Sequence, residues 1–387
     1  MADTENKKNS NSPAERAQGN VPALRFPSFT EPWCVSKLKS YLKENKERNK
    51  HSEFAKEEVL SVSGQDGIIN QIKHLGRSFA GKSVADYHVV RHGNIVYTKS
   101  PLKEYPYGIV KYNRGVDGIV STLYAVYETN NKSDGTFVEY YFASVNRINR
   151  YFKPIVRIGA KHDMKIGNEE VLQNTVCFPD IMEQKKIATF LSLLDERIAT
   201  QRRLIDKLET LIKGIAEFLT TNTPNTKIAD CLVCHSSTRQ ENQAESFGKY
   251  CVYGASGICG YTDLPDVAVD SILVVKDGSG VGTVTYASGE YSVIGTSNYL
   301  TTKNGYLLRY LYYCLMCFNF TPYKTGMAIP HIYFKDYGKA KIYCPAIEEQ
   351  RKIAAALSNI ESKIEIERTI LQQYTMQKQH LLQQMFI

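Results

Sequence analysis

Long apolar segments are absent from this sequence of 387 residues. A membrane-spanning helix needs ~18 consecutive apolar residues, and the most apolar stretch, from Leu307 to Phe320, is interrupted by Arg309. The N-terminal segment has no apolar core of the kind that directs export, and its polar composition predicts disorder for residues 1–20. We therefore expect a cytoplasmic protein without a membrane segment.

Cysteines arranged for disulfide bonds are also absent. The chain has nine cysteines, an odd number, and in a protein that is not exported free thiols are the simplest interpretation. Residues 231–235 (CLVCH) fit a haem-attachment pattern, which requires export, and together with Cys314 and Cys317 they fit a four-cysteine zinc site. Because Cys314 and Cys317 lie in a strongly apolar stretch, where buried thiols are common, we expect no metal site.

A strong excess of one charge sign is missing as well. The 48 Lys and Arg residues face 40 Asp and Glu residues, which gives a formal net charge of +8. Most of this excess lies in residues 21–177, and residues 223–343 are nearly balanced. A mildly basic chain suits a polyanionic partner but does not require one.

The sequence does contain an internal repeat. Residues 179–192 (PDIMEQKKIATFLS) and 345–358 (PAIEEQRKIAAALS) are identical at nine of fourteen positions, at a constant offset of 166. Each copy opens a long helical pattern, and its proline stands where a missing N–H costs no hydrogen bond. The repeat predicts two equivalent long helices, the first of which ends in the polar run that begins at Thr220.

Both helical patterns are heptad patterns, in which apolar residues recur in steps of four and three. One slot is polar in both copies, Gln201 in the first and Glu367 in the second, and a polar residue inside such a seam can fix its register. The natural partner of each helix is the other copy, so we expect an antiparallel coiled coil; the alternative is two unrelated helices that pack on their own domains. The other slots are Ile187, Leu191, Leu194, Ile198, Ile205, Leu208, Ile212, Ile215 and Leu219 in the first copy, and Ile353, Leu357, Ile360, Ile364, Leu371, Tyr374, Lys378, Leu381 and Met385 in the second.

The remaining sequence predicts two globular domains of mixed structure. Strand-like stretches such as 88–99 and 267–276 occur at comparable places in both. The expected fold class is α+β, with two mixed α/β domains that are each followed by a long helix. The expected order is a disordered tail (1–20), a first domain (21–177), a first helix (178–222), a second domain (223–343) and a second helix (344–387).

With these features the sequence resembles the DNA specificity subunits of Type I restriction–modification systems. The family pattern P-x-I/L-x-E-Q-x-x-I-A is matched by residues 179–188 and 345–354, and residues 24–29 resemble the family's opening segment. Residues 253–257, 277–282 and 326–331 are similar to recurrent segments of the recognition domains. The resemblance extends from about residue 21 to residue 387, and the helix motif is its specific part.

The resemblance implies a non-catalytic subunit whose two target-recognition domains each read one part of a bipartite site in double-stranded DNA. It implies that the helices act as a ruler and as the docking surface for two methyltransferase subunits, to which two nuclease-translocase (restriction) subunits are added. S-adenosylmethionine, ATP and Mg are expected on those partners, and no cofactor is expected in this chain. The sequence contains no NPPY-like methyltransferase tetrad and no DEAD-type helicase box.

Two glycine-rich segments fit nucleotide-binding patterns. Residues 76–83 (GRSFAGKS) match a P-loop, but a P-loop needs a preceding strand and a following helix, and here the chain leads into a strand. Residues 277–282 (DGSGVG) are also followed by a strand-like stretch, so we interpret them as a hairpin or a recognition loop.

The chemistry of the side chains indicates which residues could contact DNA. Phosphate contacts need Lys, Arg or small polar donors, and base reading favours Arg, Lys, Asn, Gln and short hydroxyls. The candidates are Arg77, Lys82, Lys99, Lys111, Arg114, Lys161 and His162 in the first domain, and Lys276, Ser279, Lys324, Thr325 and His331 in the second.

Two other classes of function compete with DNA recognition. One is a coiled-coil adaptor that carries two protein-binding modules and has no DNA specificity, and the other is a P-loop ATPase. The repeated helix motif speaks against the ATPase. Salt-sensitive DNA binding separates DNA recognition from the adaptor, because phosphate neutralisation makes affinity fall steeply with salt.

Overall fold

The computed structural model describes residues 19–81, 83–158 and 164–387. The chain divides into two compact units: unit 1 comprises Met1–Ala199 and Gln372–Ile387, and unit 2 comprises Thr200–Leu371. Within the described ranges, no helix combines the length and the apolar character that a membrane span requires.

The first globular region, in unit 1, is built around an antiparallel sheet with the strand order β2-β9-β6-β7. All three residues of β6 are buried, so this strand is covered on both faces. The strands are β1 (Cys34–Lys37), β2 (Leu42–Glu44), β3 (Leu60–Ser63), β4 (Gly67–Asn70), β5 (His88–Val90), β6 (Ile95–Tyr97), β7 (Val110–Tyr112), β8 (Gly118–Val120), β9 (Ala125–Thr129), β10 (Arg157–Ile158), β11 (Met164–Lys165) and β12 (Thr175–Phe178). The helices are α2 (Gln71–Leu75), α3 (Gly135–Phe142), α4 (Val145–Phe152) and α5 (Asn168–Val171).

The second globular region, in unit 2, contains a sheet with the order β14-β20-β17-β18 and a smaller sheet with the order β16-β15-β19. The central strand β17 is buried along its whole length. The strands are β13 (Thr226–Lys227), β14 (Leu232–Ser236), β15 (Tyr250–Gly254), β16 (Gly257–Thr262), β17 (Ser271–Val275), β18 (Val284–Ala287), β19 (Ser292–Val293), β20 (Ser297–Thr302) and β21 (Lys341–Ile342). The helices are α7 (Ile228–Cys231), α8 (Leu308–Cys317) and α9 (Phe334–Tyr337).

The two globular regions share one sheet topology. In each four-stranded sheet the first strand pairs with the last, the last with the middle strand, and the middle strand with its hairpin neighbour. In each region a helix, α3 or α8, follows the last sheet strand, and a short strand, β12 or β21, leads into the long helix. These short strands pair with β1 and β13, the first strands of their regions. The internal repeat therefore includes the globular regions, where the sequences have diverged.

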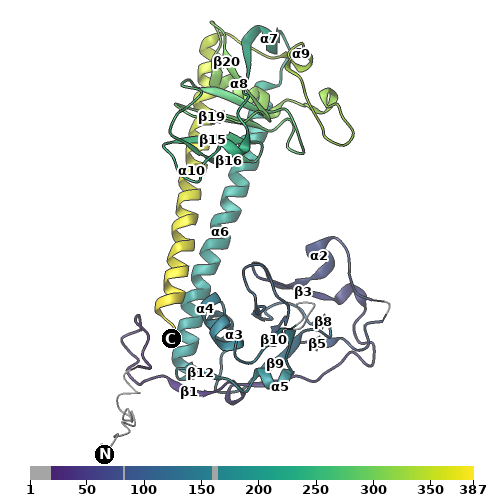
Figure 1. Ribbon diagram of the computed structural model, residues 1–387, viewed down its shortest axis with the longest axis vertical. Helices are drawn as coiled ribbons and strands as arrows, with labels where there is room; N and C mark the ends of the chain where they lie inside the picture. The colour runs from purple at the N-terminus through teal and green to yellow at the C-terminus, as the bar shows by residue number, and fades with distance from the viewer. Residues whose placement is uncertain (1–18, 82, 159–163) are drawn as a thin grey trace, which may run out of the picture. The chain divides into compact units, whose positions relative to one another are not determined.

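The two long helices are α6 (Ile181–Thr220) and α10 (Ile347–Gln384). Asp180 caps the first of them, since its Oδ1 accepts the N–H of Met182 at 2.7 Å, and the helix ends at Thr220 as predicted. Unit 1 contains the beginning of α6 and the end of α10, and unit 2 contains the reverse. The helices lie side by side in each unit and run antiparallel, which confirms the predicted coiled coil (Figure 1).

The expected seam residues are buried or half-buried, including the polar pair. The amide Nε2 of Gln201 donates to the backbone oxygen of Glu367 at 3.0 Å and also to its carboxylate. When two equivalent helices pair antiparallel, equivalent residues contact each other only at the middle of the pair, and Gln201 and Glu367 are such equivalent residues. That Gln201 and Glu367 fix the register remains a prediction.

The glutamine of the repeated motif anchors each globular region to its long helix. Both glutamines are buried. The Oε1 of Gln184 accepts the N–H of Asp134 at 3.0 Å, and the Oε1 of Gln350 accepts the N–H of Leu307 at 3.0 Å. Asp134 and Leu307 are the N-cap residues of α3 and α8. The motif therefore satisfies an otherwise unpaired N–H at a helix start in both copies.

A second repeated contact lies about three turns further along each long helix. The hydroxyl of Tyr140 on α3 donates to the carboxylate of Asp195 at 2.7 Å, and the hydroxyl of Tyr313 on α8 donates to Glu361 at 2.9 Å. The ammonium of Lys378 on α10 lies 2.5 Å from the Asp195 carboxylate. This ion pair explains why the apolar seam tolerates a lysine at that slot.

Unit 1 is completed by the end of α10 and the residues after it. The ring of Phe386 packs against Trp33 and Phe137, with centroids 6.4 and 5.3 Å away. The backbone N–H of Leu24 donates to the Gln384 oxygen at 2.9 Å. Residues near both ends of the sequence thus form one core.

His88 on β5 gives unit 1 an expected dependence of stability on pH. Its side chain is buried, and neither ring nitrogen has a hydrogen-bond partner among the residues that the structure describes. Burial, followed by the charges of Arg48 and Lys99, lowers the pKa of His88 to about 4. Between about pH 6.5 and pH 4 the unfolded chain binds a proton that the folded unit does not. Stability should therefore fall with decreasing pH in this window, by about 3 kcal/mol in total.

The measurement is denaturant unfolding at pH 7.5 and pH 5 for wild type, His88→Leu and the control His51→Leu, whose histidine is exposed. Because the ring nitrogens bond to nothing, His88→Leu should keep its stability at pH 7.5 and lose most of the difference between the two pH values. An equal difference in His88→Leu and wild type would contradict the assignment.

Candidate nucleic-acid interface

Two turns of the fold carry several of the residues expected to contact DNA. The first turn follows the middle strand of the sheet, at residues 98–109 between β6 and β7 and at residues 276–283 between β17 and β18. The second is described in unit 2 alone, at residues 324–331, and precedes the strand that leads into the long helix. The first turn thus presents candidate residues in both units.

Lys99 and Lys276 occupy corresponding positions in the first of these turns. The N–H of the preceding residue crosses the turn in both cases, from Thr98 to the Ile109 oxygen at 3.1 Å and from Val275 to the Thr283 oxygen at 3.0 Å. The ammonium of Lys99 donates to Asn168 at 2.8 Å, and burial lowers its pKa.

In unit 2 the two turns are joined by backbone hydrogen bonds. The N–H of Gly278 donates to the Pro330 oxygen, and the N–H of Ile332 donates to the Lys276 oxygen, both at 3.0 Å. The sequence separates these segments by about fifty residues, and the fold brings together Lys276, Thr325 and His331. Residues 277–282 form the turn of the β17–β18 hairpin, as predicted.

Asp277 links the charged groups of these two turns. Its carboxylate accepts from the Lys276 ammonium and lies 2.9 Å from Nδ1 of His331. Burial alone would raise the pKa of Asp277, but the hydrogen bonds from Lys276 and His331 outweigh it and the pKa is lowered. The carboxylate is therefore ionised at neutral pH and holds both donors in place.

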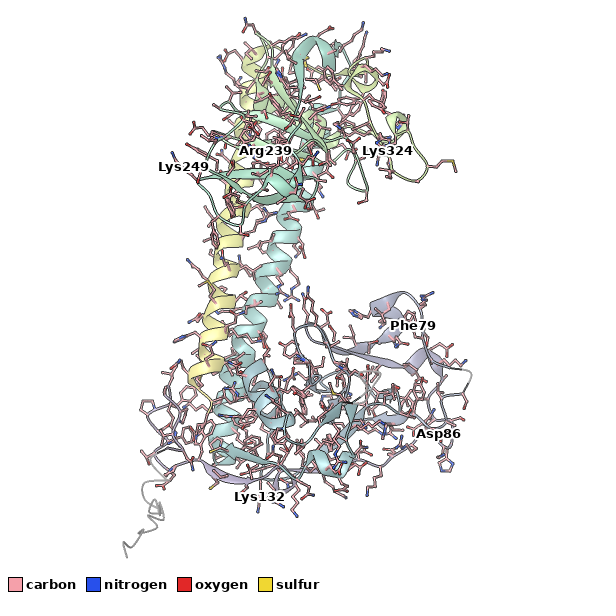
Figure 2. The ribbon with its side chains drawn as sticks, in the orientation of Figure 1. Phe79, Asp86, Lys132, Arg239, Lys249 and Lys324 are labelled. Carbon is pink, nitrogen blue, oxygen red and sulfur yellow. The ribbon has the colours of Figure 1, made fainter. Side chains whose placement is uncertain are left out.

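Lys324, Thr325 and Ser279 are exposed in the same part of unit 2. Figure 2 shows Lys324 at the base of a protruding loop. In the part of the chain that the structure describes, the Lys324 ammonium has no ion-pair partner, so its charge is available to a ligand.

Two candidates in unit 1 are held by one carboxylate. Lys111 and Arg114 contact Glu139 of α3, at 3.2 and 2.5 Å. The Glu139 side chain is only 10% exposed, so at least one cation is required beside it. Arg114 is itself exposed and also lies over the ring of Tyr112, and it is the more accessible of the two.

Arg77 is exposed and stacks on Phe79, with its guanidinium carbon 4.6 Å from the ring centroid. Phe79 is itself exposed and marks the surface of unit 1 in Figure 2. The surrounding GRSFAGKS segment follows the short helix α2 and precedes β5, which reverses the strand–loop–helix order of a P-loop. Lys82, Lys161, His162 and most of the predicted N-terminal tail lie outside the described residues.

Exposed apolar residues beside the candidate turns were missed by the choice of polar residue types. Met327 is 106% exposed and Ile329 is 59% exposed, both in the turn of residues 324–331. In the sequence this turn reads as an apolar segment, and no periodicity marks it as a surface feature. Only its glycine and proline, at Gly326 and Pro330, signal a turn.

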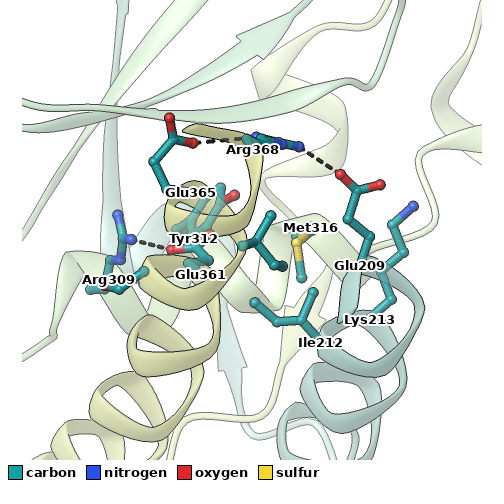
Figure 3. Close-up of a pocket in the computed structure, with 11 residues that line it drawn as sticks. Glu209, Ile212, Lys213, Arg309, Tyr312, Met316, Glu361, Glu365 and Arg368 are labelled. Carbon is teal, nitrogen blue, oxygen red and sulfur yellow. Dashed lines mark hydrogen bonds and ion pairs between the residues drawn. The ribbon is translucent and has the colours of Figure 1, made fainter. Parts of the chain in front are cut away.

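A pocket of about 550 Å³ lies in unit 2 between α6, α8 and α10. Figure 3 shows that two of its cations are already paired, since Arg309 contacts Glu361, and Arg368 contacts both Glu365 and Glu209. These pairs are part of the packing of α8 and the long helices.

The cysteines considered for zinc do not converge. Cys231 points to Cys344, with a distance of 3.8 Å between the two sulfurs, and Cys314 is buried in the same core cluster. Cys234 and Cys317 are half-buried. Across residues 19–81, 83–158 and 164–387, no group of three or more His, Cys, Asp or Glu side chains could hold a metal ion.

Comparisons with known proteins agree with this architecture. Residues 214–375 match the family described as the Type I restriction modification DNA specificity domain. The S subunit of a Type I restriction-modification system from M. genitalium has the same fold, with a TM-score of 0.60 at 16% identity, over 95% of this chain and 99% of that one. A chain from a structure on complex assembly and conformational transition of the type I R-M system has a TM-score of 0.53 at 15% identity, over 90% and 96%. No curated protein matches the sequence.

Proposed function

We propose that this chain is the DNA-reading subunit of a Type I restriction–modification complex. The proposal is supported by the match of residues 214–375 to the Type I restriction modification DNA specificity domain and by the fold that the chain shares with Type I S subunits. In this proposal each globular region is a target-recognition domain. Each domain reads one half of a bipartite site in double-stranded DNA, and the chain itself performs no chemistry.

The observation that carries the proposal is the duplication of one module. Each copy consists of a globular region with the same strand order and of a long helix, joined through the same buried glutamine. Two copies of a reading module on paired helices suit a target with two separated parts. In each copy, a candidate lysine lies in the turn after the middle strand of the sheet, Lys99 in the first and Lys276 in the second.

We infer that the paired helices also position partner subunits. The expected assembly contains two methyltransferase subunits, which bring S-adenosylmethionine, and two restriction subunits, which use ATP and Mg. Adenine methylation and cleavage would then take place on those partners in the cytoplasm.

The test is adenine-methylation sequencing of a host with and without this gene, in the presence of the partner methyltransferase. A bipartite motif with a fixed spacer, present only with the gene, is the expected result. A strain with the methyltransferase alone is the control.

Absence of any gene-dependent motif calls for a binding measurement on the purified complex. DNA affinity should fall linearly with salt on a double logarithmic plot, with a slope of about −0.9 per neutralised phosphate. No salt-sensitive binding would favour the adaptor without DNA specificity.

A further inference from the structure

The turn of residues 324–331 presents two apolar side chains to solvent. Met327 and Ile329 are 106% and 59% exposed, and they follow one another with only Ala328 between them. Single exposed apolar side chains are common on protein surfaces, so exposure alone assigns them no role. Two of them on one short turn form an apolar tip that another molecule can cover.

The turn is held rigidly at its base. Thr325 and His331 exchange two backbone hydrogen bonds of 2.9 and 2.7 Å, and the Pro330 oxygen accepts from Gly278. Gly326 has φ +88°, and a Cβ at this position would lie 2.4 Å from the Ile329 oxygen. Because only glycine fits there, the conformation that exposes Met327 and Ile329 is built into the sequence.

The charge around the turn favours a polyanion. From Tyr291 to Lys335 the sequence contains no aspartate or glutamate. Lys324 stands at the base of the turn (Figure 2), and Lys335 is exposed beyond it. Asp277, an acidic residue that contacts the turn, is paired with Lys276 and His331.

The size of the apolar tip separates two kinds of partner. A stable protein interface buries roughly 800 Å² on each partner, far more than two side chains supply. Proteins that bind the minor groove of DNA, by contrast, frequently insert apolar side chains, methionine and isoleucine among them, between stacked bases.

We propose that residues 324–331 form a wedge that inserts Met327 or Ile329 at a base step of the target and unstacks it. The inference rests on the proposed DNA-reading function and deepens it. The second recognition domain would then also discriminate between DNA sequences by the free energy needed to unstack a base step, which depends on the sequence of that step. The hydrogen-bonded base of the turn keeps the tip in place, and Lys324 neutralises a nearby phosphate.

The test uses the complex of the full chain with its methyltransferase subunits and a duplex that carries the methylated motif. 2-Aminopurine replaces one base at a time along both half-sites, because its fluorescence rises when stacking is lost. With the wild type, we expect fluorescence to rise several-fold at one position other than the adenine that the methyltransferase takes out of the stack. With Met327→Ala plus Ile329→Ala, the rise should disappear and affinity for this duplex should fall ~10-fold or more, while Met327→Leu should retain both.

Leu264→Ala is the matched control, since Leu264 is also exposed and apolar in unit 2, and it should leave fluorescence and affinity unchanged. If the wild type binds the duplex and no position brightens, or if the double variant brightens it equally, the wedge is wrong. If the double variant instead loses its methyltransferase subunits on gel filtration, the tip is a protein contact and the wedge is also wrong. Failure of the wild type to bind the duplex at all would overturn the proposed function.

Discussion

A variant with seven extra residues in each long helix is expected to direct its methyltransferase partners to a target whose spacer is about three base pairs longer. The insertions duplicate residues 202–208 and 368–374, directly after Gln201 and Glu367, which contact each other. One heptad preserves the apolar seam and adds ~10 Å to each helix. DNA rises ~3.4 Å per base pair, so a ruler made of these helices should select the longer spacer.

The readout is the spacer in methylation sequencing and not the affinity. Three extra base pairs also rotate one half-site by about a third of a turn, at ~10.5 base pairs per turn, and this twist should weaken binding. An insertion in α6 alone is the control, because it shifts the seam on one side only and should destabilise the helix pair. An unchanged spacer in the double insertion would show that the helices do not set the distance.

Arg25→Ala is expected to destabilise unit 1 by ~3 kcal/mol, because it leaves a buried carboxylate without its cation. The guanidinium of Arg25 donates to both oxygens of Glu183, at 2.8 and 2.7 Å. The Glu183 side chain is 1% exposed. The hydrogen bond to Glu183 raises the pKa of Arg25, so the guanidinium stays charged.

Trp33 makes this prediction directly measurable. It is the only tryptophan in the sequence, and it is buried in unit 1 against Phe137 and Phe386. Its fluorescence during denaturant unfolding therefore reports on unit 1.

The repeat supplies a matched control for the same experiment. Glu349 occupies the Glu183 position of the second motif but is exposed, so Glu349→Ala should change stability by less than ~0.5 kcal/mol. Replacing both members, with Arg25→Met and Glu183→Leu, should recover most of the loss, because no charge is then left buried. Equal midpoints for Arg25→Ala and wild type would contradict a stabilising role of the ion pair.

The pair of Glu183 and Glu349 also shows where sequence reasoning stops. The helices, their seam and their antiparallel pairing were predictable, because a heptad repeat is a local pattern that recurs along the chain. The difference between the two glutamates was not predictable, because it depends on Arg25, which approaches from 158 residues away. Lys378 in the seam has the same explanation, since its partner Asp195 lies on the other helix.

The candidate interface was only partly visible for a related reason. Residue chemistry selected Lys276, Thr325 and His331, and the fold brings them together. It equally selected Lys111 and Arg114, which the structure ties to Glu139. The exposure of apolar residues such as Met327 could not be predicted, because the same residue types occur in an exposed turn and in a buried core. That these side chains touch DNA remains a prediction.

Unit 1 is built from two segments that are far apart in the sequence, and this affects when it can fold during synthesis. Trp33 and Phe137 pack on Phe386, so this core cannot close until residues 372–387 have been made. All of Thr200–Leu371 must be translated first, which at ~5–20 residues per second is a delay of roughly 10–30 s. During that interval the nascent chain carries an open aromatic surface, and it should then be a substrate for chaperones that bind such surfaces.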